Sequence, residues 1–410
     1  MLLRIAFRNL VRSWRRSSVV ISSIAVGLGA SVFMVGLMKG MVQQMTDTAV
    51  RTRLGNVAVM ARGYNADPDA GRNLPDGGRQ VLAAMELRPG VAASARLRGE
   101  GLVQSARLSA PAILVGVDPR AERGVSSVPA SIVEGSFLGE GSRARRPREL
   151  PPLVLGQRMA RKLRARVGEK VVVHAPGKNG LGAFRIRGIF RTPSSEFDGL
   201  YVYLPLADLQ YLLDVEGAVT EVALVLERPE EVGELKRFLE QRLAGSDVEI
   251  LAWEEREQRL AALLGLMQNI YWIFYSAIFI AMGFGIANVL FMAVYERIRE
   301  FGLLRAMGLR SSRLVEMVLL ESLFLTLAGT AMGILLGLAI IATLGERGLD
   351  LAWFSEGLRA YGIGTSIRPL VEFDQLAWPV GVAAATGLVS GIFPALRAAR
   401  LRPAEALRHI

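Results

Sequence analysis

The chain has 410 residues, no cysteine and two histidines, and 51% of its residues are hydrophobic while 21% are charged. This composition excludes a disulfide framework, a zinc–thiolate site and a histidine-rich metal site. The mean hydropathy of +0.33 indicates that part of the chain lies in lipid. The net charge of +11 suits nucleic acid or anionic lipid, and the positions of the arginines distinguish the two.

The first segment, residues 1–16, combines apolar and basic residues at helical spacing. Its apolar positions are Leu3, Phe7, Leu10, Val11 and Trp14, and its neighbouring basic stripe is Arg4, Arg8, Arg12 and Arg15. This pattern predicts an amphipathic helix lying in the cytoplasmic interface of a membrane.

Four later stretches contain the roughly 20 apolar residues that cross about 30 Å of hydrocarbon. They predict transmembrane helices at residues 17–39, 269–295, 314–345 and 376–396. No charged residue lies in the middle of any span, which argues against a secondary transporter or an ion channel. Glycines at four-residue spacing predict close packing of the helix backbones. They are Gly36, Gly40, Gly329, Gly333, Gly337, Gly387 and Gly391.

Arginines concentrate in three of the segments that border these spans: residues 1–16, 296–313 and 397–410. The positive-inside rule places these three segments in the cytoplasm and the acidic loop 346–375 outside. Both termini are therefore predicted to be cytoplasmic, in a multi-pass membrane protein. The basic excess reflects this topology and attraction to anionic lipid, so we expect no nucleic acid partner.

The long segment at residues 40–268 then lies outside and has mixed α and β patterns, with a stalk at about 252–268. The predicted fold class is thus a four-helix membrane protein with a large extracytoplasmic α+β domain inserted between the first and second spans. Strands are expected at 57–60, 112–117, 153–155, 170–174, 184–190, 200–204 and 221–226. Helices are expected at 78–87, 156–165, 206–213 and 229–243.

This domain contains no recognisable catalytic constellation. His174 ends a predicted strand and is interpreted as structural. Glu196 and Asp198 could form an acid–base pair, but no other catalytic group converges on them and they are interpreted as structural. We therefore predict a non-catalytic chain.

The cytoplasmic segment 296–313 carries apolar residues just outside the membrane. Phe301, Leu303, Leu304 and Met307 are expected to form an exposed apolar knob on a short helix that ends at Gly308. Two readings are open at this point: a docking surface for a cytoplasmic protein, or an interfacial helix resting on lipid.

The order R-E-F-G-L-L-R-A-M-G at residues 299–308 resembles the coupling-helix signature of MacB/FtsX-type ABC transporter permeases. Residues 393–408 are similar to the ending of that family, and Ala6, Arg8, Asn9 and Leu10 are similar to its leader. Residues 55–57, 154–157, 167–171 and 196–212 resemble the lipoprotein-releasing (Lol-type) permeases in particular. The resemblance covers essentially the whole chain.

The resemblance implies a permease subunit that docks a cytoplasmic ABC ATPase dimer and pairs with a second permease, identical or related. ATPase coupling would fall on Glu300, Phe301, Gly302, Leu303, Leu304, Arg305, Ala306, Met307 and Gly308. The resemblance also implies a location in the bacterial inner membrane. The substrate would be a lipoprotein, extracted from the outer leaflet of that membrane by mechanical transmission and passed to a periplasmic carrier. The chain has no G-x-x-x-x-G-K-[ST] phosphate loop, so ATP and magnesium are expected in the partner and no cofactor here.

The lipid-anchored substrate is expected in a cavity between the first two spans of the paired permeases. The predicted cavity residues are Phe33, Met34, Leu37, Met41, Met267, Ile270 and Phe274. Methionine suits a surface that must fit varied acyl chains. The alternative is that these residues face lipid or pack ordinarily.

One departure concerns the connection at residues 175–183, where a carrier-capturing Lol-type permease has a long hairpin arm. The sequence APGKNGLGA predicts a tight turn, too short for such an arm. This chain is then a companion subunit without the carrier contact, or it handles another substrate. Alternative functions are a MacB-like exporter of periplasmic peptides or drugs, an FtsX-like regulator, and a membrane adaptor without an ATPase.

Overall fold

The computed structural model describes residues 8, 12, 14–86, 88–139, 150–371 and 374–400. The chain forms two compact units. Unit 1 comprises Met1–Met41, Leu264–Leu349 and Ile367–Ile410, and unit 2 comprises Val42–Leu263 and Asp350–Ser366.

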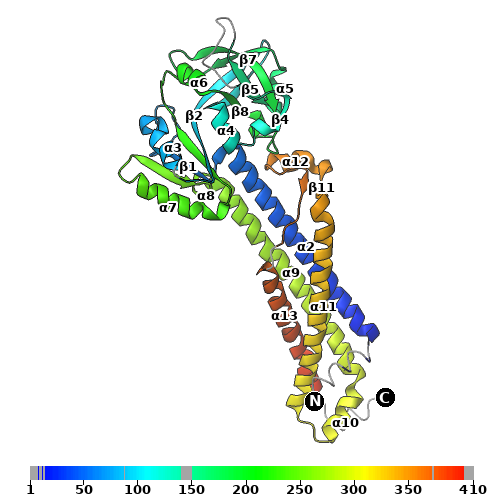
Figure 1. Ribbon diagram of the computed structural model, residues 1–410. Helices are drawn as coiled ribbons and strands as arrows, with labels where there is room; N and C mark the ends of the chain where they lie inside the picture. Colours follow the sequence, from blue (N-terminus) through cyan, green and yellow to red (C-terminus); the bar gives the residue numbers. More distant parts are fainter. Residues whose placement is uncertain are drawn as a thin grey trace. The chain divides into compact units, whose positions relative to one another are not determined.

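Unit 1 is built from long helices (Figure 1). They are α2 (Trp14–Ala49), α9 (Gln258–Glu296), α11 (Ser311–Arg347) and α13 (Asp374–Ala399), with the short α10 (Ile298–Ala306) between α9 and α11. Among the described residues, four segments are long and apolar enough to cross a membrane: Ser17–Leu54, Gln258–Glu296, Ser311–Gly345 and Leu376–Ala399. These segments agree in number and position with the predicted spans.

Glycines bring the helices of unit 1 into close contact. Gly329, Gly333 and Gly337 lie on the face of α11 that contacts α2. A Cβ atom built on these glycines would lie 2.7, 2.9 and 2.8 Å from the Cβ atoms of Ile24, Leu28 and Val32, respectively. Any side chain at these positions would therefore push the two helices apart, which confirms the predicted packing role.

Unit 2 is an α+β domain around a ten-stranded sheet. The strand order is β10-β1-β9-β2-β3-β8-β5-β7-β4, and β6 pairs with β2 and β7. The pairs β3–β8 and β5–β7 are parallel and the other ladders are antiparallel. The strands are β1 (Val57–Ala61), β2 (Val91–Gln104), β3 (Ser109–Val117), β4 (Ile132–Gly135), β5 (Pro152–Gly156), β6 (Lys170–His174), β7 (Leu181–Phe190), β8 (Tyr201–Pro205), β9 (Glu221–Leu226) and β10 (Val248–Ala252).

Helices and turns pack apolar residues against this sheet. The largest cluster of buried side chains lies among β3, β5, β6, β7 and β8, and a second lies between β1, β9 and two helices, α3 and α7. The helical elements are η1 (Val50–Leu54), η2 (Pro75–Gly78), α3 (Arg79–Glu86), α4 (Pro119–Val125), η3 (Pro129–Ser131), α5 (Gln157–Leu163), η4 (Phe197–Gly199), α6 (Leu206–Leu213), η5 (Pro229–Glu231), α7 (Val232–Arg242), α8 (Trp253–Arg256), η6 (Ala352–Phe354) and α12 (Ser355–Ala360). The two-residue strands β11 (Leu349–Asp350) and β12 (Ser366–Ile367) form a separate small sheet.

Several predicted boundaries differ from the structure. The first helix does not end at residue 39, because α2 continues to Ala49 and then widens into the π-helical turn η1. The predicted stalk at 252–268 begins with the last residue of β10, and the helix is interrupted at Glu257 between α8 and α9. The predicted loop at 346–375 contains short elements of its own, and its residues Asp350–Ser366 belong to unit 2.

Most of the predicted interfacial helix at residues 1–16 and residues 401–410 of the predicted tail lie outside the described residues.

Candidate functional site

The short helix α10 is held by an apolar cluster. Phe301 is 1% exposed and packs with Val294, Leu314, Met317, Val318, Ala395 and Ala398, and the Arg297 guanidinium lies 5.1 Å from the centre of its ring. The prediction that Phe301 belongs to an exposed knob was therefore wrong, and Leu304 is also partly buried against this cluster. A helix that lies beside two others must bury one stripe of side chains, and Phe301 falls on that stripe.

The opposite side of α10 exposes apolar side chains. Leu303 is 53% exposed and Met307 is 69% exposed, and Ala306 beside them is exposed as well. Gly308 follows with a positive φ of 93°, so it ends the helix as predicted. We refer to Leu303, Ala306 and Met307 as the α10 surface.

Charged residues fix α10 at both ends. Arg297 Nε donates to Glu300 at 2.9 Å, and its Nη1 donates to Glu321 of α11 at 3.3 Å. Arg305 Nη1 donates to the carbonyl of Ala399, at the end of α13, at 2.9 Å. Arg305 and Phe301 therefore anchor α10, while the α10 surface is the part that faces outward.

The predicted cavity residues of unit 1 are all at least partly exposed. Met34, Ile270 and Phe274 are 39%, 44% and 55% exposed, and Phe33, Leu37, Met41 and Met267 are partly buried. An apolar groove of about 820 Å³ lies elsewhere, between α9 and α13, and includes Trp272, Phe279, Phe284, Trp378 and Phe393. None of the seven predicted residues lines this groove, and their contact with substrate stays a prediction.

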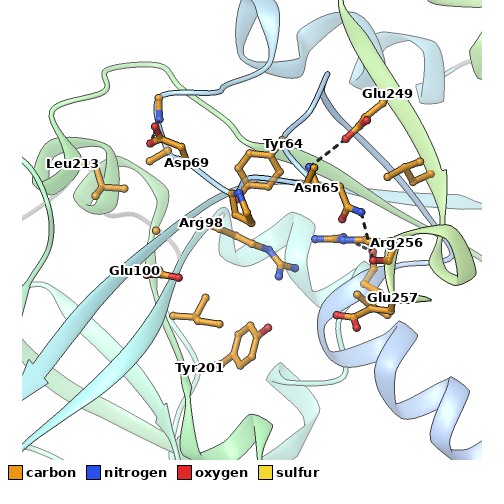
Figure 2. Close-up of a pocket in the computed structure, with 18 of the residues that line it drawn as sticks. Tyr64, Asn65, Asp69, Arg98, Glu100, Tyr201, Leu213, Glu249, Arg256 and Glu257 are labelled. Atoms are coloured by element: carbon orange, nitrogen blue, oxygen red, sulfur yellow. Dashed lines mark hydrogen bonds between the residues drawn. The ribbon is translucent and has the colours of Figure 1, made fainter. Parts of the chain in front are cut away.

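Unit 2 contains a cleft of about 1260 Å³ (Figure 2). The carboxylate of Glu249 accepts a hydrogen bond from the backbone N–H of Asn65 at 3.2 Å on one wall. Arg98 and Arg256 extend into the base of the cleft, and Tyr201 lies below them in the view of Figure 2.

The arginines at this base belong to a buried ionic cluster of Arg96, Arg98, Glu122, Glu221 and Arg256. Arg96 on β2 makes two contacts to Glu122 on α4: Nη2 lies 2.7 Å from Oε1, and Nε lies 3.0 Å from Oε2. Glu221 on β9 is fully buried, lies 2.8 Å from Arg98 Nη2, and also accepts from Arg256 on α8. Burial alone would raise the pKa of Glu221, but the guanidinium groups of Arg256, Arg98 and Arg96 lower it to about 2.

These five residues were missed by the reasoning from the sequence. The signal was present, because Arg96 and Arg98 alternate on one face of an extended segment and Glu221 opens an apolar strand. The extended segment β2 was itself not predicted, so its arginines had no assigned neighbours.

The residues examined for catalysis have structural contacts. His174 Nε2 lies 2.9 Å from Gln104 Oε1. Glu196 and Asp198 lie at the 3₁₀ turn η4, with Glu196 at its N-cap. Glu196 is exposed, whereas Asp198 is buried and accepts hydrogen bonds from the backbone N–H and hydroxyl of Thr192 at 2.9 and 2.8 Å. These contacts give Asp198 a structural role.

The predicted short connection before β7 is confirmed. Strands β6 and β7 form an antiparallel hairpin, and its turn is closed by a 2.7 Å hydrogen bond from Ala175 N to Gly180 O. No long arm extends from this hairpin, all of which lies within the described residues.

Comparisons with known proteins cover both units. The MacB-like periplasmic core domain matches residues 17–242, and the FtsX-like permease C-terminal domain matches residues 272–403. The lipoprotein-releasing system transmembrane protein LolC of Neisseria meningitidis serogroup B is 25% identical over 95% of this chain and 93% of its own length. The corresponding LolE of Haemophilus influenzae is 27% identical over 71% of each chain.

A third relative is the macrolide export ATP-binding/permease protein MacB of Chlorobium luteolum, 38% identical over 125 residues. That match covers 30% of this chain and 16% of the relative. The domain match over more than half of the chain, together with four candidate membrane spans, identifies the chain as a member of the MacB/FtsX family of ABC transporter permeases.

Proposed function

We propose that this chain is the permease subunit of a transporter that extracts lipoproteins from the outer leaflet of the bacterial inner membrane for delivery toward the outer membrane. A separate cytoplasmic ATPase dimer would bind ATP and magnesium and supply the energy. The observation that carries the proposal is the α10 surface, where Leu303 and Met307 face outward from a helix anchored by Phe301.

The anchoring explains how α10 would transmit force. Phe301 packs against residues of α9, α11 and α13, and Arg305 is bonded to the end of α13. A partner that moves the α10 surface therefore moves three long helices with it. Exposed apolar groups on such a rigid base are typical of protein–protein contacts.

The substrate assignment rests on the relatives. The LolC match extends over nearly the whole chain, and that protein belongs to a lipoprotein-releasing system. The described spans also carry their charged side chains near the ends, as with Glu321, which pairs with Arg297. Extraction from the outer leaflet needs no polar path through the membrane. The short β6–β7 turn favours a subunit that pairs with a second permease, which would contact the carrier.

The similarity to the macrolide exporter MacB supports a second candidate function, the export of periplasmic peptides or drugs. The two functions differ in the proteins that would accompany the permease. A lipoprotein releaser would be found with diacylated lipoproteins, whereas an exporter would be found with a periplasmic adaptor or an outer-membrane channel.

The test is purification of the tagged full-length chain from membranes, followed by mass spectrometry of the bound proteins. We expect an ATPase, a second permease and lipoproteins. Met307→Glu places a charge in the proposed contact and should lower ATPase recovery about tenfold, because a charge buried without a partner is costly. Tyr211→Glu, at an exposed position of unit 2, is the matched control and should leave recovery unchanged.

Recovery of no ATPase with the wild-type chain, or equal recovery with Met307→Glu, would overturn the coupling role. Recovery of an ATPase and a channel without lipoprotein would replace lipoprotein release by export.

A further inference from the structure

The end of the first long helix is fastened inside unit 2 by side chains from the sheet. Helix α2 passes into η1, whose last carbonyl groups have no partner within the helix. Tyr203 on β8 donates its hydroxyl to the carbonyl of Thr52 at 3.1 Å. Arg96 Nη1 and Arg98 Nη2 donate to the carbonyl of Arg53, the first at 3.0 Å.

The start of the second long helix is fastened at the same place. Arg256 is the last residue of α8, two residues before α9 begins. Its Nη1 donates to the carbonyl of Leu54 at 3.1 Å, and its Nη2 donates to Glu221 on β9. Glu257, the residue between α8 and α9, lies 3.2 Å from Arg53 Nη1. The end of η1 and the segment just before α9 are therefore both linked to the carboxylate of Glu221 on the sheet, through Arg98 and Arg256.

The charges of the cluster suit this task. A helix C-terminus carries partial negative charge, which the three guanidinium groups oppose, and Glu122 and Glu221 balance most of their positive charge. Guanidinium groups hold fixed, forked directions, so they define an angle as well as a distance. Because buried ion clusters contribute little net stability compared with apolar packing, fixing this geometry is the better reason for their presence.

We propose that the ionic cluster is the joint through which α2 and α9 move the sheet of unit 2 during the transport cycle. The inference rests on the proposed function, because the motion would begin with an ATPase at α10. Both helices continue without interruption from unit 2 into unit 1, so displacement of either one reaches this joint. Arg96, Arg98, Glu221 and Arg256 are then positioning residues for coupling, and none of them needs to touch substrate.

The test is hydrogen–deuterium exchange on the full-length chain purified with its ATPase, with and without ATP and vanadate. In the wild type, we expect trapping to change the exchange of α10 and of the sheet around β9. Arg256→Met keeps the apolar stem of the side chain and leaves Glu221 paired with Arg98. In this variant the response of α10 should remain, while the response of the sheet should fall about tenfold, within the usual range of coupling between sites.

Three further variants separate coupling from folding. Arg256→Lys keeps the charge but not the fork and should restore only part of the response. Tyr203→Phe removes one hydroxyl at nearly constant volume and should reduce the response without unfolding unit 2. Arg259→Met changes an exposed arginine near the start of α9 and should match the wild type.

The outcomes distinguish the two proposals. If α10 in the wild type does not respond to ATP and vanadate, the proposed function fails. If α10 responds and the sheet responds equally in the wild type, Arg256→Met and Tyr203→Phe, the joint is wrong and the proposed function stands. Loss of the sheet response in Arg259→Met as well would also reject the assignment to the cluster. If Arg256→Met retains ATP hydrolysis while its substrate release falls about tenfold, the result would support the joint.

Discussion

Arginine side chains bond the carbonyl groups at two helix ends, one in each unit, and the two sites differ in burial. In unit 1, the partly exposed Arg305 bonds the carbonyl of Ala399 at the end of α13. In unit 2, the end of η1 receives the buried Arg96 together with Arg98 and Arg256, whose side chains are 12% and 8% exposed, and glutamates neutralise all three. The same chemical device is thus a modest cap where water reaches it freely and an interdependent cluster where little water reaches it.

The largest expected effect is the loss of a carboxylate from the buried cluster. Glu221→Gln keeps the shape of the side chain but leaves Arg98 and Arg256 without their counter-charge. We expect the free energy of unfolding of unit 2 to fall by about 3–5 kcal/mol. The measurement is the unfolding transition of the full-length chain in detergent.

The matched control is Glu231→Gln on the surface of unit 2. Glu231 lies 2.8 Å from Arg228, whose side chain is 77% exposed. This variant should change the free energy of unfolding by less than about 1 kcal/mol. Equal effects of the two substitutions would show that burial does not make the difference.

Asp198 sharpens the comparison, because it is a buried carboxylate for which burial outweighs the Thr192 hydrogen bonds and the charges of Arg359 and Arg191 that lower its pKa. Burial raises the pKa of Asp198 to about 6 from 3.8. The folded state then binds this proton more tightly than the unfolded state, so the stabilisation present at low pH is lost as pH rises from 3.8 to about 6. Glu221 behaves in the opposite way, since its stabilisation is lost as pH falls from 4.5 toward 2.

We therefore expect the ionisation of Asp198 to lower the free energy of unfolding of the wild type by about 3 kcal/mol as pH rises from 3.8 to about 6. Asp198→Asn should flatten that part of the profile. The check is the thermal unfolding midpoint of both proteins as a function of pH, and identical profiles would contradict the assignment. Asp198 also positions Thr192, whose carbonyl accepts a hydrogen bond from Arg359 at 2.8 Å. We therefore expect residues 350–366 to be held less firmly when the stabilisation by Asp198 is lost.

The smallest expected effect is the loss of the arginine cap in unit 1. Arg305→Met removes the hydrogen bond to Ala399 but keeps the apolar stem of the side chain. Because this site is partly exposed, the free energy of unfolding should fall by only about 1 kcal/mol. A loss as large as that of Glu221→Gln would show that the two helix ends are equivalent after all.

Reasoning from the sequence succeeded where one local pattern decides the structure. The apolar runs predicted the four membrane helices, glycine spacing predicted their close packing, and the strands at Lys170–His174 and Glu221–Leu226 were predicted with their observed bounds. Gly308 was predicted to end α10 because a positive φ favours glycine. The exposure of Leu303 and Met307 also followed from the pattern.

Reasoning from the sequence failed where contacts between distant segments decide the structure. The residues around Phe301 have the pattern of an exposed apolar knob. In the structure, α11 and α13 cover Phe301, and no local sequence pattern predicts this burial. Strand β2 mixes glycine, charge and small residues, so its pattern is weak, and only its pairing with β9 and β3 makes it a central strand.

The sequence by itself determined that this protein spans a membrane, which segments cross it, and the family signature at residues 299–308, because hydropathy and short motifs are local properties. Only the tertiary structure decided where its buried charges meet. Arg96, Glu122, Glu221 and Arg256 come from four separate segments, and the folded sheet brings them to one place. A charge is stable in a protein interior only when its partners are fixed around it, and those partners are a property of the fold.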